Sequence, residues 1–255
     1  HDSFKINEET SFWHWKSRDA GGKSALDYLI KVEGVKFVDA VLALCEENPC
    51  YIPPPSQPEQ EKEFALPPAS ANNRRVFAYL LKRGISRKVI EACVRAGILY
   101  ESADYHNAVF VGADREGKPR HIHKHSTAAQ GSFKGNAPGS KPEYSFHWIG
   151  GGDTLFLFEA PIDMLSFISM HKQHWKSSSY AAACGVSDKV LWKTMEGRPF
   201  IRNVCICLDN DETGQKAAQR ISKALTEKNI RNQILVPTRK DWNEDLLFLR
   251  KEDRK

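Results

Sequence analysis

The sequence contains no long apolar run and few features of an exported protein. No stretch approaches the roughly 20 consecutive apolar residues that a membrane-spanning helix needs, and no signal-peptide pattern is present. The six cysteines include no C-x-x-C pair, and Cys205 and Cys207 stand two apart in a predicted strand without a second ligand pair. We therefore expect reduced core thiols in a cytoplasmic protein, and neither zinc sites nor disulfides.

Several catalytic signatures are also missing. There is no P-loop and no Ser/His/Asp set with convincing spacing. The run HIHKH (121–125) puts three histidines on one face of a predicted strand, which would suit a metal site. Because its neighbours include Lys and Arg but no cysteine, we favour a basic strand that faces a polyanion. The chain begins with His1, not with Met, so we expect a fragment or missing leading residues.

Positive charge is concentrated in the middle of the chain. The 255 residues carry a net charge of +5, and residues 74–150 hold 13 Lys and Arg against 6 Asp and Glu, together with five of the nine histidines. Residues 1–73 hold 7 against 12. A basic segment favours a polyanion partner, with nucleic acid as the first candidate, although a merely solvated basic surface has the same composition.

Proline marks a boundary in the first third of the chain. Residues 48–73 contain seven of the thirteen prolines, which block helices and sheet ladders, so we interpret them as a linker. Before it, residues 1–47 predict a small α+β unit with strands in SFKI and SFWHW and a helix after the Gly21–Gly22 pair. A second helix has an apolar face at i, i+3, i+4 and i+7, made by Val38, Val41, Leu42 and Cys45.

The remaining chain divides near residue 150. Residues 74–150 predict an α+β segment, with two helices that end at Gly84 and Gly97 and a hairpin with its turn at 114–117. Residues 151–255 alternate apolar strands (154–158, 179–183, 203–208 and 232–236) with helices, of which 214–229 is the clearest. Unbroken apolar strands separated by helices predict an α/β domain with a parallel sheet covered on both faces.

Acidic residues follow three of these four strands. Glu159 and Asp163 come after the first, Asp209 and Asp211 after NVCICL, and Asp241 and Asp245 after the last. Ligands bind at the carboxyl ends of parallel strands, and all-oxygen ligation selects Mg²⁺ or Mn²⁺. Acids near helix starts also serve as caps, which we would favour for Asp211 alone. Three clusters at three strand ends favour a shared metal site instead.

These residues carry a family resemblance. FEAPIDMLS, CLDNDETGQKAA and KDWNEDLL are similar to the Toprim domain of DnaG-type primases, topoisomerases and some nucleases, in the subfamily common in primase-like proteins of plasmids and other mobile elements. The resemblance implies a four-stranded, mainly parallel sheet flanked by helices. It also implies catalytic roles for Glu159, Asp209 and Asp211, which with Asp163, Asp241 and Asp245 would hold metal.

The resemblance extends to the two preceding parts. Residues 74–150 resemble the segment before Toprim in primases, which implies nucleotide contacts by Lys134 and Lys141 and template contacts by basic residues, for which Arg83, Arg115, Arg120 and Lys124 are candidates. Residues 1–47 resemble the primase zinc-binding domain, but FWHWKS leaves only His14 of the potential ligands. We therefore expect no zinc. Trp13 and Trp15 share one face, which favours a core over a base-stacking surface.

The sequence therefore predicts a primase that makes short RNA primers on single-stranded DNA from NTPs, for replication or transfer of a mobile element, by a two-metal scheme. Glu159 is alternatively a general base. A Toprim nuclease or nickase and a non-catalytic DNA-binding accessory protein remain alternatives, and a topoisomerase would need a further tyrosine-bearing domain. No helicase-like segment follows, so DnaG-like helicase docking is not expected, and a replicative helicase or relaxase encoded elsewhere is a further candidate partner.

Overall fold

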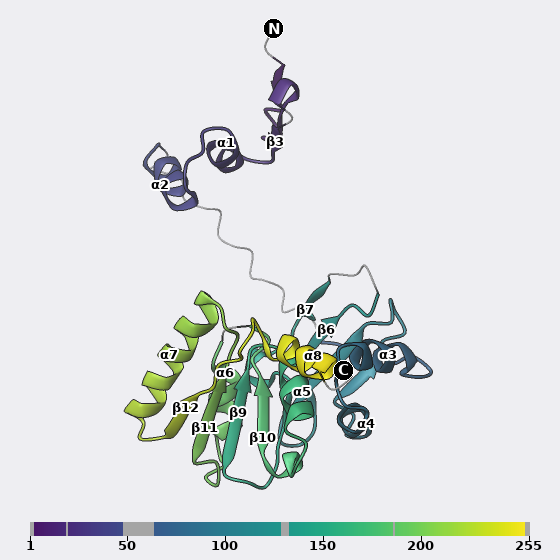
Figure 1. Cartoon of the computed structure of the whole chain (residues 1–255). Helices are drawn as coiled ribbons and strands as arrows, with labels where there is room; N and C mark the ends of the chain where they lie inside the picture. Colours follow the sequence, from purple (N-terminus) through teal and green to yellow (C-terminus); the bar gives the residue numbers. More distant parts are fainter. Residues whose placement is uncertain (1–2, 19, 48–63, 129–132, 186, 253–255) are drawn as a thin grey trace. The chain divides into compact units, whose positions relative to one another are not determined.

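A computed structural model describes residues 3–18, 20–47, 64–128, 133–185 and 187–252 of the chain. The chain divides into two compact units, residues 1–60 and 61–255, which Figure 1 draws in sequence colours. Among the helices within these ranges, none is long and apolar enough to cross a membrane. The two units are described in turn.

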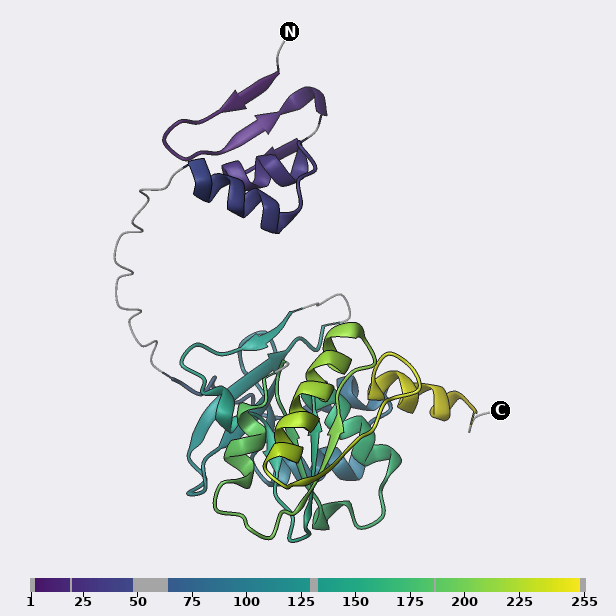
Figure 2. The same ribbon diagram turned by 90° about the vertical axis from the view of Figure 1, so that its left-hand side faces the viewer.

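The first unit combines a three-stranded sheet with two helices (Figure 2). Its elements are β1 (Phe4–Ile6), β2 (Trp13–Trp15), η1 (Lys16–Arg18), β3 (Ala20–Gly22), α1 (Ala25–Lys31) and α2 (Phe37–Glu47). Trp13 is buried, stacks with Phe4 and donates from Nε1 to the Ser24 carbonyl oxygen at 3.0 Å. The expectation that Trp13 belongs to a core is thus confirmed, whereas Trp15 is half-buried with Arg18 over its ring.

The predicted apolar face of α2 is largely exposed to solvent. The helix forms as expected, but Val38 and Leu42 are 64% and 55% exposed. Ala40, on another side of α2, is the residue that is fully buried. Helical periodicity identified the stripe correctly, but within the described residues the stripe does not pack into a core.

The second unit begins with an α+β segment. Its elements are α3 (Arg74–Lys82), α4 (Arg87–Arg95), β4 (Leu99–Glu101), β5 (Ala108–Ala113), β6 (Pro119–His125), β7 (Lys134–Asn136) and η2 (Pro142–Tyr144). Strands β4 to β7 form an antiparallel sheet in sequence order. Gly84 and Gly97 have φ values of +79° and +72° just after α3 and α4, so the predicted helix ends are confirmed.

The end of the expected linker is part of this unit. Residues 48–63 lie outside the described residues, but 64–73 are bound to β4. The Tyr100 hydroxyl donates to the Pro67 carbonyl oxygen at 2.7 Å, Ala69 bridges to Ser102, and the Ser70 amide donates to the Glu101 carbonyl oxygen at 2.8 Å. Proline content predicted a linker through residue 73, and the last ten of these residues instead form an ordered edge.

The α/β domain completes the second unit. Its elements are β8 (His147–Trp148), β9 (Thr154–Phe158), α5 (Pro161–Met170), η3 (Trp175–Ser177), β10 (Ser179–Ala182), α6 (Lys189–Met195), β11 (Asn203–Cys207), α7 (Glu212–Glu227), β12 (Arg231–Ile234) and α8 (Trp242–Glu252). The sheet order is β12-β11-β9-β10-β8. The four predicted strands are parallel, and β8 adds an antiparallel fifth at one edge.

Alternate residues of these strands enter two different cores. Leu155 and Leu157 of β9 pack with α6 and α7 on one face, whereas Phe156 and Phe158 pack on the other face with α5 and α8. Because both faces are apolar, the strands read as continuous apolar runs, and the prediction of a sheet covered on both sides is confirmed. Cys205 and Cys207 both point into the α5 side, as free buried thiols.

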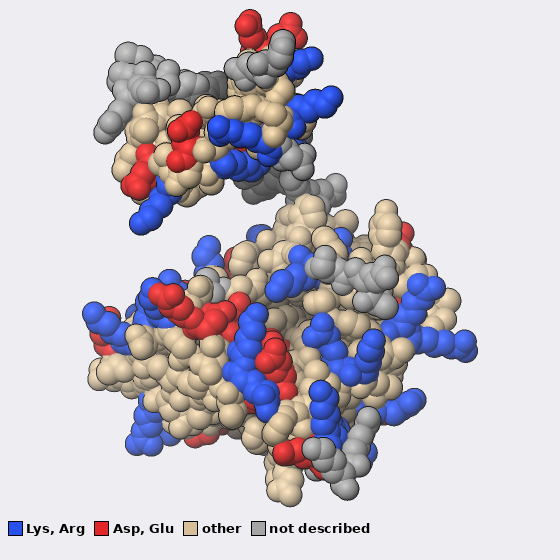
Figure 3. Space-filling model, turned by 45° about the horizontal axis from the view of Figure 1, so that its top comes forward, with Lys and Arg blue, Asp and Glu red and all other residues tan. Residues whose placement is uncertain are grey.

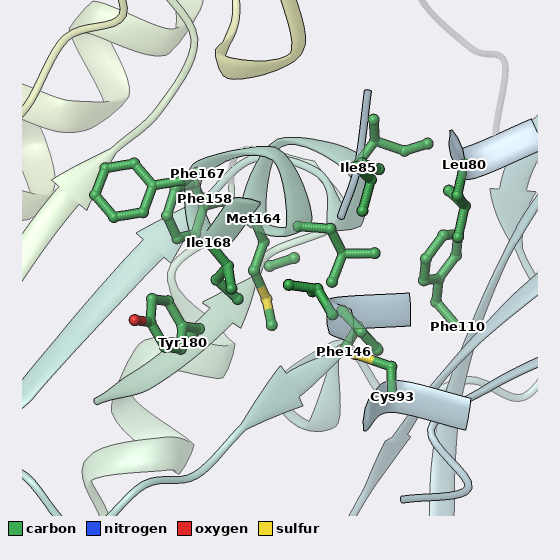
Figure 4. Close-up of a cluster of buried hydrophobic side chains, with 14 of the residues drawn as sticks. Leu80, Ile85, Cys93, Phe110, Phe146, Phe158, Met164, Phe167, Ile168 and Tyr180 are labelled. Atoms are coloured by element: carbon green, nitrogen blue, oxygen red, sulfur yellow. The ribbon is translucent and has the colours of Figure 1, made fainter. Parts of the chain in front are cut away.

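The core on the α5 side joins the two parts of the second unit. Figure 4 shows Leu80, Cys93 and Phe110 of the α+β segment together with Met164 and Phe158 of the α/β domain. The Phe110 and Phe146 rings meet edge to face, with centroids 5.2 Å apart. The boundary near residue 150 is therefore not a structural gap, because one apolar cluster spans it.

The histidine strand is mostly buried, which corrects the expectation of a polyanion-facing strand. His121 and His123 of β6 are buried, and His123 bonds Asn136 Oδ1 through Nδ1 at 2.8 Å. Burial lowers the pKa of His121 to about 4, and it lowers the pKa of His123 and His125 as well. These rings are therefore neutral near pH 7 and do not attract phosphate.

Candidate active site

Adjacent parallel strands bring the first two acids together. Cys207 of β11 lies opposite Phe158 of β9, so the chain leaves both strands at the same edge of the sheet. Glu159 follows β9 directly, and Asp209 follows β11 after one residue. Glu159 and Asp209, which are 50 positions apart in sequence, thereby lie at the same carboxyl edge of the sheet, which is where parallel α/β sheets bind ligands.

Asp209 is held by the turn between β11 and α7. Gln215 Nε2 donates to the Asp209 carbonyl oxygen at 3.0 Å, and a Cβ at Gly214 would collide with that same oxygen. The turn therefore requires glycine at this position for a reason of space. Asp209 Oδ1 is buried and has no hydrogen-bond partner among the described residues. Such an orphaned carboxylate oxygen calls for a ligand.

The surroundings of Asp209 disfavour its charged form. Burial raises the pKa of Asp209, the charges of Glu159, Asp241 and Asp211 act in the same direction and Lys240 opposes them, and together they bring the pKa to about 7. Burial followed by the Asp211 charge also raises the pKa of Glu159. Asp209 is therefore close enough to Glu159, Asp211 and Asp241 for their charges to act on it, although the four residues follow three different strands.

Two of the acids also cap helices. Asp211 Oδ1 accepts from the Gly214 amide at 2.8 Å at the start of α7, and Asp241 Oδ1 accepts from the Glu244 amide at 2.7 Å at the start of α8. Capping thus applies to Asp211 and Asp241 but not to Asp209. One capping bond uses one carboxylate oxygen and leaves a second oxygen for another partner.

Asp163 is a buried residue of α5, and the charges of the other acidic residues act on it. Burial raises its pKa well above the ordinary value, and the Asp209 and Asp241 charges act in the same direction. Its Oδ1 accepts from the Asn243 amide at 3.2 Å. Asp245 takes no part: its oxygens accept from the Thr238 and Arg239 amides at 2.7 and 2.9 Å. Asp245 therefore holds the loop before α8, which differs from its expected position as a metal ligand.

The basic residues expected to bind nucleic acid divide into separate locations. Lys134 and Arg83 both act electrostatically on His125, and Lys134 also acts on Glu159. Lys134 therefore lies near the acids, whereas Arg83 is connected to Asp163 through Asn243. Lys124 alternates with His123 and His125 along β6 and so lies on the opposite face. Figure 3 shows Lys and Arg side chains on either side of acidic ones on one face of the second unit.

The other three basic residues lie elsewhere. Arg120 is paired with Asp114 at 2.7 Å, which offsets its charge. Arg115 lines a small hollow together with Lys193 and Arg198. Lys141 is exposed before η2, where its amide donates to the Arg120 carbonyl oxygen at 2.9 Å. The net charge of residues 74–150 could not distinguish these locations, because it ignores pairing and side-chain direction.

Asn243 is a site residue that sequence reasoning missed. Its Nδ2 donates to the Arg83 carbonyl oxygen and to Ser166 Oγ, both at 2.9 Å, while its Oδ1 accepts from Arg83 Nη1 at 3.0 Å. The backbone amide of Asn243 donates to Asp163 Oδ1. This buried residue therefore connects Arg83 to the acidic residues. The run KDWNED contains Asn243 between acidic residues, but its spacing does not reveal that the Asn243 side chain is buried among Arg83 and Ser166.

The donor set suits a hard divalent cation. Carboxylate oxygens at one sheet edge, one of them buried without a partner, match the all-oxygen preference of Mg²⁺ or Mn²⁺. Across the described parts of the chain, no group of three His, Cys, Asp or Glu side chains is already arranged to hold a metal ion. Asp209 and Glu159 would hold the ion, with Asp211 and Asp241 beside them.

Two parts of the chain match known protein families. Residues 156–246 match the Toprim-like family, and residues 78–153 match a family described as protein of unknown function DUF3991. The match confirms, for residues 156–246, the Toprim resemblance seen in the sequence.

Individual proteins resemble the chain over most of its length. An uncharacterized protein of Bacillus anthracis, pXO2-78, is 25% identical over 246 residues, which cover 90% of this chain and 71% of that protein. The primase fragment of the bacteriophage T7 primase-helicase protein is 15% identical, with a TM-score of 0.52, over 99% of this chain and 91% of that one. The Aquifex aeolicus primase is 16% identical, with a TM-score of 0.49, over 98% and 74%. The T7 similarity shows a shared fold.

Proposed function

We propose that this protein is a primase-like nucleotidyltransferase that makes short RNA primers on single-stranded DNA with Mg²⁺ or Mn²⁺. The observation that carries the proposal is the buried, unpartnered Oδ1 of Asp209 at the strand edge, beside Glu159 and within reach of cationic side chains. The fold shared with a primase fragment supports the same reaction class.

Each group at the edge has a defined task in this proposal. Asp209 and Glu159 would hold the cation, and a bound cation would neutralise developing charge on phosphate oxygens. Asp211 and Asp241 add negative charge while their caps fix the starts of α7 and α8. Lys134 lies close enough to Glu159 for its charge to lower the pKa of that residue. It would position the nucleotide phosphates. Arg83, oriented by Asn243, would contact the template.

The partners follow from the same chemistry. Single-stranded DNA and NTPs are the proposed substrates, and a helicase supplied by another protein is a proposed partner because the T7 relative is a primase-helicase. A role in replication or transfer of a mobile element, and a cytoplasmic location, stay predictions from the sequence.

One assay tests the function against the nuclease or nickase alternative. Labelled single-stranded DNA is incubated with NTPs and Mg²⁺ or Mn²⁺, and both primer synthesis and loss of the template are measured. We expect ribonucleotide products that require all three components and that disappear in Asp209→Asn. Template cleavage without NTPs would replace the proposal with a Toprim nuclease, and neither product would favour the DNA-binding accessory role.

A further inference from the structure

Two basic hollows on the second unit share a wall. The first, of about 660 Å³, is lined by Arg75, Lys82, Arg83 and the rings of Tyr79, Tyr105 and His125. The second, of about 600 Å³, lies on the other side of Lys82 and is lined by Arg87, Lys172, Arg250 and Lys251. Lys82 and Leu247 line both hollows, so the two hollows are neighbours.

The charge of this surface is almost unopposed. Neither hollow has an Asp or Glu among its lining residues. Of the cations, Arg87 is paired with Glu91 at 2.9 Å, whereas Arg75, Lys82, Lys172 and Lys251 form no salt bridge with any residue in the described ranges. Unpaired cations in a row along a hollow attract a polyanion more strongly than a single small anion.

Tyr105 adds an exposed aromatic ring to this surface. Its side chain is 88% exposed at the border of the first hollow, and its φ of +56° is followed by a φ of +52° at His106. Two consecutive non-glycine residues in the left-handed region are strained, and such strain persists where the surrounding structure enforces it.

The turn that carries Tyr105 is firmly held. His106 Nδ1 bonds Glu101 Oε1 at 2.7 Å, and Glu101 Oε2 accepts from the Arg75 amide at 2.9 Å at the start of α3. Ser102 also bonds Asn107 through its amide and its hydroxyl, at 3.0 and 3.1 Å. The ring of Tyr105 is therefore presented to solvent on a fixed support. An exposed ring on a rigid turn beside a basic groove is what base stacking needs.

We propose that the two hollows form one binding track for single-stranded nucleic acid, in which Tyr105 stacks on a base and Lys82, Lys172 and Lys251 contact successive phosphates. A single strand fits better than a duplex, because bases paired and stacked inside a duplex offer no free face to Tyr105. The track rests on the proposed function for the nature of its ligand, and it extends the contacts beyond residues 74–150 to α8 and the end of α5.

Binding experiments test the track without any chemistry. Fluorescence anisotropy without metal or NTPs measures affinity for labelled oligothymidylates of about 4 and about 16 nucleotides, the range of single-strand sites. We expect Lys172→Glu with Lys251→Glu to weaken binding of the long oligonucleotide at least about tenfold, to leave the short one nearly unchanged, and to reduce the salt slope by roughly 0.7 for each lost phosphate contact. Lys223→Glu, on the exposed side of α7, is the matched control and should change neither.

Stacking is tested separately. Tyr105→Ala should weaken binding of oligothymidylate about five- to hundredfold and leave an abasic oligonucleotide of the same length unaffected, and Tyr105→Trp should restore affinity. Phe200→Ala removes another exposed ring, outside both hollows, and should have no effect.

The results separate the track from the proposed function. Unchanged affinity and salt slope in the lysine double variant, equal loss on abasic and normal strands in Tyr105→Ala, or equal competition by duplex DNA would overturn the track. If primers are made while these variants bind like wild type, the track is wrong and the primase proposal stands. If the variants behave as expected but no primers form, the track stands without the primase.

Discussion

Asp209 differs from its neighbouring acids in what its side chain can bond. Asp211 and Asp241 each use one carboxylate oxygen to accept a hydrogen bond from a backbone amide at a helix start. Asp209 Oδ1, in contrast, is buried without a hydrogen-bond partner in the described structure. The sequence could predict that these residues meet, because strand ends converge. It could not predict which acid caps a helix, because capping depends on where the first helical turn begins.

The raised pKa of Asp209 leads to a prediction about pH and stability. Its ordinary value is 3.8 and its value in the fold is about 7. Between these values the folded protein keeps a proton that the unfolded chain has released, so rising pH weakens the metal-free fold. Asp209→Asn removes this cost. We expect urea denaturation in EDTA to show a gain of about 1–2 kcal/mol at about pH 8, a figure reduced for solvent screening, and almost no gain at about pH 4.5. Equal gains at both pH values would contradict this origin.

Mg²⁺ binding should reverse the gain in stability expected for Asp209→Asn in EDTA. A cation that binds the folded state raises its stability by linkage, so Mg²⁺ should raise the melting temperature of the wild type and raise that of Asp209→Asn much less. Asp211→Asn keeps the cap, since Asn caps as well as Asp, and should lose part of the Mg²⁺ effect without loss of stability in EDTA. Calorimetric melting with and without Mg²⁺ measures both. Identical Mg²⁺ shifts in the wild type and both variants would place the ion elsewhere.

At the scale of elements, local patterns located strands and helices better than they located buried faces. The strand at 121–125 forms as predicted, but His121 and His123 are buried and His123 packs against the Phe110 ring. The stripe on α2 forms as predicted and stays exposed. Periodicity specifies which residues share a face, whereas burial depends on what packs against that face, which distant parts of the chain supply.

The turn from β11 to α7 gives an element-scale prediction. A Cβ at Gly214 would meet the Asp209 carbonyl oxygen and backbone, which cannot move aside without shifting the acid edge. We expect Gly214→Ala to cost roughly 1–3 kcal/mol, as for other overpacked sites, and to weaken Mg²⁺ stabilisation.

Gly151→Ala is the matched control, because a Cβ there meets nothing within 4 Å. Urea denaturation should find Gly151→Ala close to wild type. A Gly214→Ala protein with unchanged stability and an unchanged Mg²⁺ response would show that the turn does not depend on this close approach.

At the scale of the whole molecule, the large apolar clusters of the described residues belong to the second unit, whereas the first unit buries Trp13 and Ala40. The three buried apolar clusters are built from residues 76–246, and Phe64 packs against one of them. Composition predicted a linker over residues 48–73, and the division between the two compact units falls inside this range, after residue 60. It placed the end of the linker too late, because proline content does not reveal that a segment is bonded along the edge of a sheet.

Two truncations test this boundary. A fragment of residues 61–255 retains all three clusters, so it should fold and melt near the temperature of the second unit in the full chain. A fragment of residues 74–255 loses Phe64 from the third cluster, the Pro67 partner of the Tyr100 hydroxyl and the Ser70 bond to Glu101. Each lost hydrogen bond costs about 0.5–1.5 kcal/mol, so this fragment should melt several degrees lower, because 1 kcal/mol corresponds to roughly 2–4 °C at this size. Calorimetry of both fragments decides the point: equal melting temperatures would mean that residues 64–73 act only as a connection, as their prolines first indicated.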